Sequence, residues 1–518
     1  MKLQQGLSKR IYTACCAVMG KRITKFIFKY WSEILLGILV FSYIAYFSWF
    51  TILRYRTLYA SYFDLGIMHQ TVYNTFISLK TWDFSRFLEM TNPHGIDQVK
   101  RMAVHNDPLL ALIAPLYFIY SGPETLLVLQ SVLLGLGALV IYAIGHHVLN
   151  TYPNKKLISL FFAFSYLFYP PLQLTNHFDF HAAVLATPFL LCLFYFFLKR
   201  KYGWCFVFIA LSLLAKEQIG LTISFFGLYA LTQVYFQNKK ERKRILFFGL
   251  ISFIVGTAWF FVSMKLIIPH FRSGLHFALE YFGDFGDSTT SVFVGLITKP
   301  NLVFQYIFRK DTYEYLYAIL GPLGFISLLS PLQLLIATPE LAINLLSKSG
   351  AMRNIYFHYT AVITPFVYIS GIYGFKRLIT FIKNGKKYSW FIVALFVVCT
   401  IYFSFTLSPM PYSVHREIHP IFWPAKESTD AFIWQKKLEN DSIKVMVTGH
   451  MAPVFASRRY LYNFSLRYDL ADYVVLSVDE VYNSSDSVAL KPAYEQLLKD
   501  IRFARVYKNQ SFEVYKKI

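Results

Sequence analysis

Residues 124–149 read ETLLVLQSVLLGLGALVIYAIGHHVL, a stretch in which Glu124 is the only Asp, Glu, Lys or Arg. A run of this length and apolar content can cross a lipid bilayer as an α-helix. Similar runs recur along the 518-residue chain, which is 56% hydrophobic, 19% aromatic and 15% charged. Soluble globular chains carry about 25% charged residues. The sequence therefore predicts an α-helical protein that crosses the membrane many times.

We predict about 11 spans. Several are short and would have to be tilted or broken to fit the bilayer. If the chain starts in the cytoplasm and alternates, its C-terminus lies outside. The predicted spans are 34–53, 124–149, 157–172, 182–198, 203–215, 218–237, 246–268, 313–330, 331–346, 359–375 and 389–408.

Basic residues gather between these spans on the predicted cytoplasmic side. The formal net charge is +22, and five stretches with 22 Lys or Arg and one acid, Glu241, carry +21 of it. An excess of Lys and Arg in cytoplasmic loops sets the orientation of a membrane protein. Nucleic-acid binding is therefore not needed to explain the charge. The stretches are 1–32, 155–156, 199–201, 239–244 and 376–387.

The chain divides into three regions. Residues 1–32 form a basic cytoplasmic N-terminus, and 33–408 a transmembrane domain whose first outer loop is 54–123. In that loop, apolar residues at helical spacing predict a helix lying along the membrane surface. Residues 409–518 predict a small extracytoplasmic α/β domain. Its expected elements are strands 444–448 and 473–478, a helix at 493–500, and a hairpin of 503–507 with 511–515.

Asp64 stands near the start of the predicted loop helix. In a structural interpretation it caps or charges the first helical turn, which is common. In a functional interpretation its carboxylate takes a proton from an acceptor hydroxyl. Spacing alone favours the structural interpretation.

Further ionisable residues lie at the outer ends of spans, where charged groups are costly and often functional. His177, Asp179 and His181 could bind a divalent metal, or they could line a phosphate site as a polar loop. Lys216 and Glu217 interrupt an apolar stretch. They form either an internal ion pair, with Lys216 snorkelling to the interface, or a site at which Lys216 meets a lipid phosphate.

The remaining candidates are spread along the chain. Glu340 lies in an apolar segment, where it caps a broken helix or lines a cavity, and Arg353 could bind phosphate. His358 and Tyr359 open a predicted span and would also serve as interface anchors. His105 and Asp107 belong to the first outer loop. We find no nucleotide-binding loop and no serine-nucleophile motif, so ATP-driven work is not expected.

The chain resembles an uncharacterised family of prokaryotic membrane proteins, a domain of unknown function grouped with the GT-C glycosyltransferase superfamily. The resemblance runs from about residue 60 to the end. Two positions depart from it: Gln218 stands where the family often has Asp, and Asn106-Asp107 where it often has Phe-Ser. The matching pieces are Phe63-Asp-Leu-Gly-Ile67, Gln70, His105-x-x-Pro108, Leu127–Gln130, His181, Lys216-Glu217, Pro339-Glu340, Asn344-Leu-Leu-Ser347, His358-Tyr359, Pro453, Arg458-Arg459, Tyr462 and Ala471-Asp-Tyr473.

The resemblance implies a GT-C-like bundle in the plasma membrane with an outward-facing active site. It implies inverting transfer of a sugar from a polyprenyl phosphate to a lipid, glycan or protein acceptor, with Asp64 as the general base. No cofactor is certain, although a divalent metal would be compatible. Lys216, Arg353, His358 and Tyr359 would bind the donor phosphate. The residues that would shape the sugar or acceptor site, or hold a divalent ion, are His105, Asp107, Glu217 and Glu340.

Two other classes of function are compatible with the same residues. A transporter or flippase of a lipid-linked glycan would use the outward acids as a proton relay or substrate site. It would need polar groups accessible from both faces, and the sequence places them on one. An assembly factor without catalysis would tolerate substitution of every one of these acids.

Overall fold

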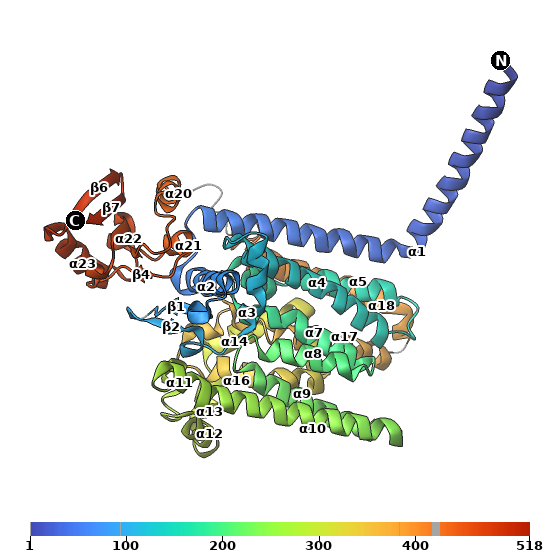
Figure 1. Ribbon diagram of the computed structural model, residues 1–518. Coiled ribbons are helices and arrows are strands. Elements are labelled where there is room, and N and C mark those ends of the chain that lie inside the picture. The colour runs from blue at the N-terminus through green and yellow to red at the C-terminus, as the bar shows by residue number, and fades with distance from the viewer. Residues whose placement is uncertain (1, 94, 383, 417–424) are drawn as a thin grey trace.

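The computed structural model describes residues 2–93, 95–382, 384–416 and 425–518, and helices dominate it (Figure 1). Five helical stretches in these ranges are long and apolar enough to cross a membrane. The first is the part of α1 (Lys2–Arg56) that follows a kink at Tyr30. The others are α4 (Glu124–Val148), α9 (Ile219–Gln233) with the next turn, α10 (Lys239–Val262) continued through α11 (Ile268–Arg272), and most of α18 (Gly385–Leu407).

The other six predicted spans are shorter or interrupted helices. In the most marked case, α5 and α6 meet at an angle of 41° because Pro170 and Pro171 begin the second helix. Every predicted span is nevertheless mainly helical, so the helical membrane fold is confirmed. The helices are α5 (Lys155–Leu167), α6 (Pro170–His177), α7 (Ala186–Leu198), α8 (Tyr202–Leu213), α14 (Lys310–Leu320), α15 (Pro331–Leu334), α16 (Thr338–Leu346) and α17 (Thr364–Phe381).

Large apolar side chains point outward from the long helices. Phe41 on α1 is 73% exposed, Phe247 on α10 is 65% exposed and Val398 on α18 is 62% exposed. Contiguous apolar surface is rare on soluble monomers. In a bilayer these side chains would face lipid, while each helix satisfies its own backbone hydrogen bonds.

Helices α9 and α10 lie unusually close because glycines face each other across the pair. A Cβ atom on Gly227 would lie 2.6 Å from the carbonyl oxygen of Gly249, and one on Gly256 would lie 2.4 Å from that of Gly220. Small residues allow membrane helices to pack backbone against backbone. This contact places two apolar walls side by side beneath the outer loops.

We expect Gly227→Leu to force α9 and α10 apart and to destabilise the protein by about 1–3 kcal/mol, the usual cost of overpacking. The readout is the half-life of the folded, detergent-solubilised protein at a fixed elevated temperature. Leu228→Ala is the matched control, because the neighbouring Leu228 is exposed. Equal half-lives for wild type and Gly227→Leu would show that the close backbone contact is dispensable.

The first outer loop folds into several short elements. The predicted helix is present as α2 (Ile67–Thr81). Contrary to the prediction from the sequence, it does not lie along the membrane surface but is buried in the protein. Its apolar side and the polar residues His69, Gln70 and Asn74 are all buried, so protein encloses the helix. Around it lie the antiparallel hairpin β1 (Glu89–Thr91) and β2 (Gln98–Lys100), and α3 (Leu109–Ile113).

The C-terminal region contains the predicted small sheet. Five strands lie in the order β4-β3-β5-β7-β6, with β3 parallel to β4 and β5, and with β7 antiparallel to β5 and β6. Sequence reasoning missed β4. The strands are β3 (Val445–Val447), β4 (Leu461–Asn463), β5 (Tyr473–Ser477), β6 (Phe503–Asn509) and β7 (Phe512–Lys517), and the helices are α20 (Ser428–Lys437), α21 (Ala452–Phe455), α22 (Val478–Asn483) and α23 (Ser487–Lys499).

The C-terminal region lies beside the segment 54–123 (Figure 1), and polar contacts tie the two together. The Gln70 side chain donates to the carbonyl oxygens of Arg458 and Arg459, at 3.2 and 3.0 Å. Arg459 pairs in turn with Glu89 at 2.7 Å. These contacts hold α2, and with it the turn that carries Asp64, against the C-terminal region.

Candidate functional site

Two adjoining cavities lie between the helical bundle and the loop segments packed on it. The larger, of about 330 Å³, has mainly apolar walls from α9, α10, α16 and the segment 277–296. The smaller, of about 180 Å³, is lined by polar groups that include Asp64, Arg101 and Asp107. His105, Lys216, Phe277 and Tyr359 line both cavities. An apolar chamber and a polar chamber therefore meet at a basic residue.

Asp64 lies in the wall of the polar cavity, in a π-helical turn (Tyr62–Gly66) between α1 and α2. One carboxylate oxygen lies 3.0 Å from Nε2 of His181, and the other accepts the Ser61 hydroxyl at 2.7 Å. Asp64 lies in the first turn of this π-helix, as the structural interpretation expected of a first-turn acid, but no side-chain cap is formed there. Burial opposes ionisation, but the hydrogen bond and charge of His181 hold the pKa of Asp64 below its usual value.

The three residues of the predicted metal motif, His177, Asp179 and His181, lie in different environments. His181 faces the polar cavity and contacts Asp64, whereas Nδ1 of His177 lies 2.8 Å from the Arg54 guanidinium. Asp179 accepts the backbone N–H of Ser61, and burial raises its pKa to about 6, with a smaller push from the charge of Asp64. A guanidinium donating to His177 occupies the nitrogen that a metal would need. The three residues are not among the described groups whose ligand atoms converge at metal-binding distance.

Asp107 forms a buried ion pair with Arg101, a residue that sequence reasoning did not single out. The side chains are only 3% and 1% exposed, and the guanidinium donates to both carboxylate oxygens at 2.8–3.0 Å. Both residues line the polar cavity. Asp107 is thus at the predicted place, but Arg101 already occupies its oxygens.

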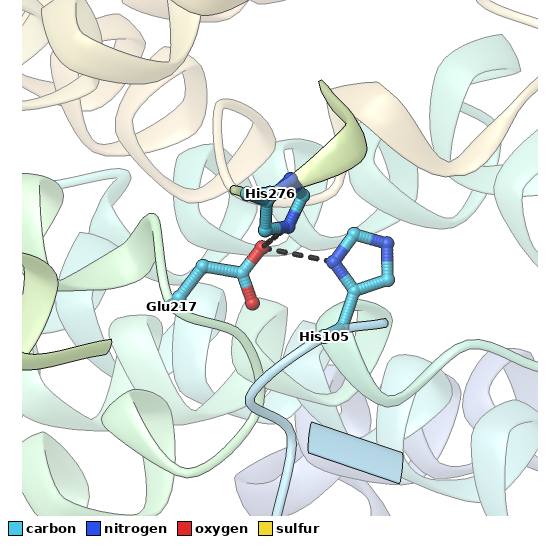
Figure 2. Close-up of side chains that lie close together, drawn as sticks. All are labelled: His105, Glu217 and His276. Atoms are coloured by element: carbon cyan, nitrogen blue, oxygen red, sulfur yellow. Dashed lines mark hydrogen bonds and ion pairs between the residues drawn. The ribbon is translucent and has the colours of Figure 1, made fainter. Parts of the chain in front are cut away.

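His105 and Glu217 come together with a third residue, His276 (Figure 2). Oε1 of Glu217 lies 2.9 Å from Nδ1 of His105 and 3.4 Å from Nε2 of His276. Oε2 accepts the backbone N–H of Asn106 at 3.0 Å. Burial alone would raise the pKa of Glu217, but these histidines hold it well below its usual value. No local pattern in the sequence around His276 would have indicated it.

Lys216 lines both cavities and forms no ion pair with any residue in the described ranges. The internal pair with Glu217 that the sequence allowed is therefore not observed. Glu340 is buried and lines neither cavity, although its neighbours Thr338 and Pro339 do. It accepts a long hydrogen bond of 3.4 Å from Gln218. Glu340 therefore lies behind the cavity wall, and its part in the sugar site stays a prediction.

His358 and Tyr359 lie where a substrate site was expected, but Arg353 does not. The His358 ring stacks on His181 with 3.8 Å between centroids, and both His358 and Tyr359 line the polar cavity. Arg353 lines neither cavity, because its guanidinium is engaged by Asp311 at 2.6 Å and by the Ser347 carbonyl at 2.5 Å. Arg353 links two loops here, and its phosphate contact stays a prediction.

The sequence matches the model of a family described as a predicted membrane protein (DUF2079) over residues 54–514. The chain belongs to this family. No curated protein matches the sequence. The family, the apolar helices and the cavities together describe an integral membrane protein with a partly polar internal site.

A solved structure shows the same kind of fold. ArnT from Cupriavidus metallidurans bound to undecaprenyl phosphate superposes with a TM-score of 0.52, at 12% identity, over 94% of this chain and 98% of that one. The archaeal oligosaccharyltransferase AglB from Archaeoglobus fulgidus, in complex with an inhibitory peptide and a dolichol-phosphate, gives a TM-score of 0.44 at 13% identity, over 95% of this chain and 75% of that one. Both are GT-C glycosyltransferases, and the ArnT match shows that this chain has a GT-C-like fold.

Proposed function

We propose that the protein transfers a sugar from a polyprenyl-phosphate donor to an acceptor on the extracytoplasmic face of the plasma membrane, with Asp64 as the general base. The observation that carries the proposal is the junction of an apolar cavity and a polar cavity at Lys216. A lipid-linked sugar has the same order of parts, with an apolar chain, a phosphate and a polar sugar. The undecaprenyl phosphate bound to ArnT, which shares the fold, supports this donor class.

The apolar cavity suits the lipid part of the donor. Leu221, Phe260 and Phe293 contribute to the mainly apolar walls, which offer hydrocarbon contacts to an isoprenoid chain. At the boundary, the Lys216 ammonium forms no ion pair within the described residues, and it is a compact charge for a phosphate. The same charge would stabilise the negative charge that grows on the phosphate as it leaves.

In the proposed reaction, the acceptor hydroxyl oxygen attacks the anomeric carbon of the sugar. The bond from that carbon to the phosphate oxygen breaks, and its electron pair leaves with the polyprenyl phosphate. The acceptor proton passes to Asp64, whose oxygens each accept one hydrogen bond here and keep lone pairs for a second partner. A single displacement of this kind inverts the anomeric configuration.

The test is turnover of a mixed pool of polyprenyl-phosphate sugars by the purified protein in lipid, with candidate acceptors. Wild type should release free polyprenyl phosphate. A protein that releases none but moves lipid-linked sugars across a liposome bilayer would be a transporter, and the transfer proposal would fall.

We expect Lys216→Met to weaken donor binding about tenfold or more, because a hydrogen bond to a charged group is lost. Titration with a fluorescent polyprenyl phosphate measures the affinity without turnover. Lys265→Met is the matched control, since Lys265 is exposed and lines neither cavity. Equal affinities for wild type and Lys216→Met would remove Lys216 from the phosphate site.

A further inference from the structure

Three chain segments converge in the wall of the larger cavity to bring His105, Glu217 and His276 together (Figure 2). One ligand atom from each residue lies within 4.8 Å of the others. Two imidazole nitrogens approach the same carboxylate oxygen, at 2.9 and 3.4 Å. The 3.4 Å contact does not meet hydrogen-bond geometry, so Nε2 of His276 is a buried polar atom without a hydrogen-bond partner in the described structure.

We propose that this cluster binds one Zn²⁺ ion through Nδ1 of His105, a carboxylate oxygen of Glu217 and Nε2 of His276. Two imidazoles and one carboxylate form a known zinc ligand set, in which three protein ligands leave one coordination position open. Nitrogen ligands disfavour Mg²⁺ and Ca²⁺, which prefer oxygen. The sequence allowed His105 and Glu217 a part in holding a divalent ion, but no family motif named above includes His276.

The groups around the cluster are arranged to hold the ligands in place. The second oxygen of Glu217 accepts the Asn106 amide at 3.0 Å, and the Asn106 side chain donates to the Ser263 hydroxyl at 2.8 Å. Outer contacts of this kind fix the orientation of metal ligands. Glu217 and His276 are also almost fully buried. A carboxylate in such a place needs positive charge nearby, which a divalent cation supplies.

Zinc binding requires a defined rearrangement of protons. Nδ1 of His276 accepts the backbone N–H of Ala278 at 2.9 Å, so in the neutral ring the proton lies on Nε2. Coordination through Nε2 moves that proton to Nδ1, and the contact with Ala278 must then open. In His105 the ring proton likewise moves from Nδ1 to Nε2. The site therefore exchanges one hydrogen bond of the turn at 276–278 for a metal bond.

The coordination position that the three protein ligands leave open on the zinc ion has a nearby source of a fourth ligand, the proposed donor phosphate. All three residues line the larger cavity beside Lys216, where the donor phosphate is proposed to lie. A phosphate oxygen is the ligand that would complete the coordination. This last step rests on the proposed function, whereas zinc binding itself does not.

The test is metal analysis of the full-length protein, purified through a tag without histidine, loaded with ZnCl₂ and desalted. Wild type should retain about one zinc ion per chain. His276→Ala and Glu217→Gln should lose it. His270→Ala is the matched control and should retain it, because His270 is an exposed histidine of α11.

A second readout uses only the wild-type protein, so it remains valid where a variant fails to fold. Wild type loaded with Co²⁺ should show the visible absorption bands of a tetrahedral nitrogen and oxygen site. Wild type without bound metal after loading, or folded His276→Ala that still holds one zinc ion, would overturn the proposal. Neither measurement uses turnover, so failure of the zinc site is distinct from failure of the transferase.

Discussion

Asp64→Asn should abolish sugar transfer while leaving the donor bound. General-base catalysis typically contributes about 10²–10⁴-fold to a rate, and a fall of this order in the single-turnover rate is expected. An amide cannot take the acceptor proton. Its size is nearly that of the carboxylate, so the polar cavity keeps its shape.

The matched control for Asp64 is Ser61→Ala. Ser61 donates its hydroxyl to one Asp64 oxygen, so the control removes a partner of the carboxylate and keeps the base. We expect a much smaller fall in rate for Ser61→Ala than for Asp64→Asn. Donor affinity, measured with a fluorescent polyprenyl phosphate, should be close to wild type in both.

Two results would contradict the role of Asp64. Transfer by Asp64→Asn at the wild-type rate would exclude it as the base. Loss of donor binding together with transfer would mean that the Asp64–His181 contact holds the site together and that the base lies elsewhere. The contact itself is short, at 3.0 Å, so this second outcome is a real structural alternative.

The membrane fold was largely predictable because it follows from composition. Long apolar runs such as 124–149 have one way to satisfy their backbone in lipid, which is a helix. The breaks were harder to place. Between α5 and α6 the turn follows from two adjacent prolines, but its 41° angle depends on the helices packed around it.

Helix α2 shows where a pattern stops being informative. Leu65, Met68, Val72 and Phe76 predicted a helix with one apolar face, and the helix exists. The pattern could not show what covers the other face. Gln70 is fully buried because the backbone of Arg458 and Arg459, almost 400 residues later, supplies its partners.

The site was predictable in part. Asp64, His105, Lys216 and His181 were singled out as outward ionisable groups, and they line the same pair of cavities. His276 could not be found, because it lies in a loop without a periodic pattern and only the fold brings it to Glu217. Arg353 stands five residues before His358 in the sequence, yet its side chain turns to Asp311.

Asp107→Asn should destabilise the protein more than most single substitutions. It leaves the Arg101 guanidinium, 1% exposed, without a charged partner. Removing one member of a buried ion pair costs about 3–5 kcal/mol, because the other charge remains buried. We expect a sharply shortened half-life of the folded, detergent-solubilised protein at a fixed temperature.

The double variant Arg101→Met with Asp107→Leu separates stability from function. Replacing both charges by apolar groups of similar size is often neutral for stability, so the half-life should recover. Transfer should stay impaired, since the polar cavity loses two of its lining groups. Recovery of both the half-life and the transfer activity would show that the Arg101–Asp107 ion pair only supports the loop. An unchanged half-life for Asp107→Asn would show that the ion pair contributes little, and that the geometry of the loop is set by its backbone contacts instead.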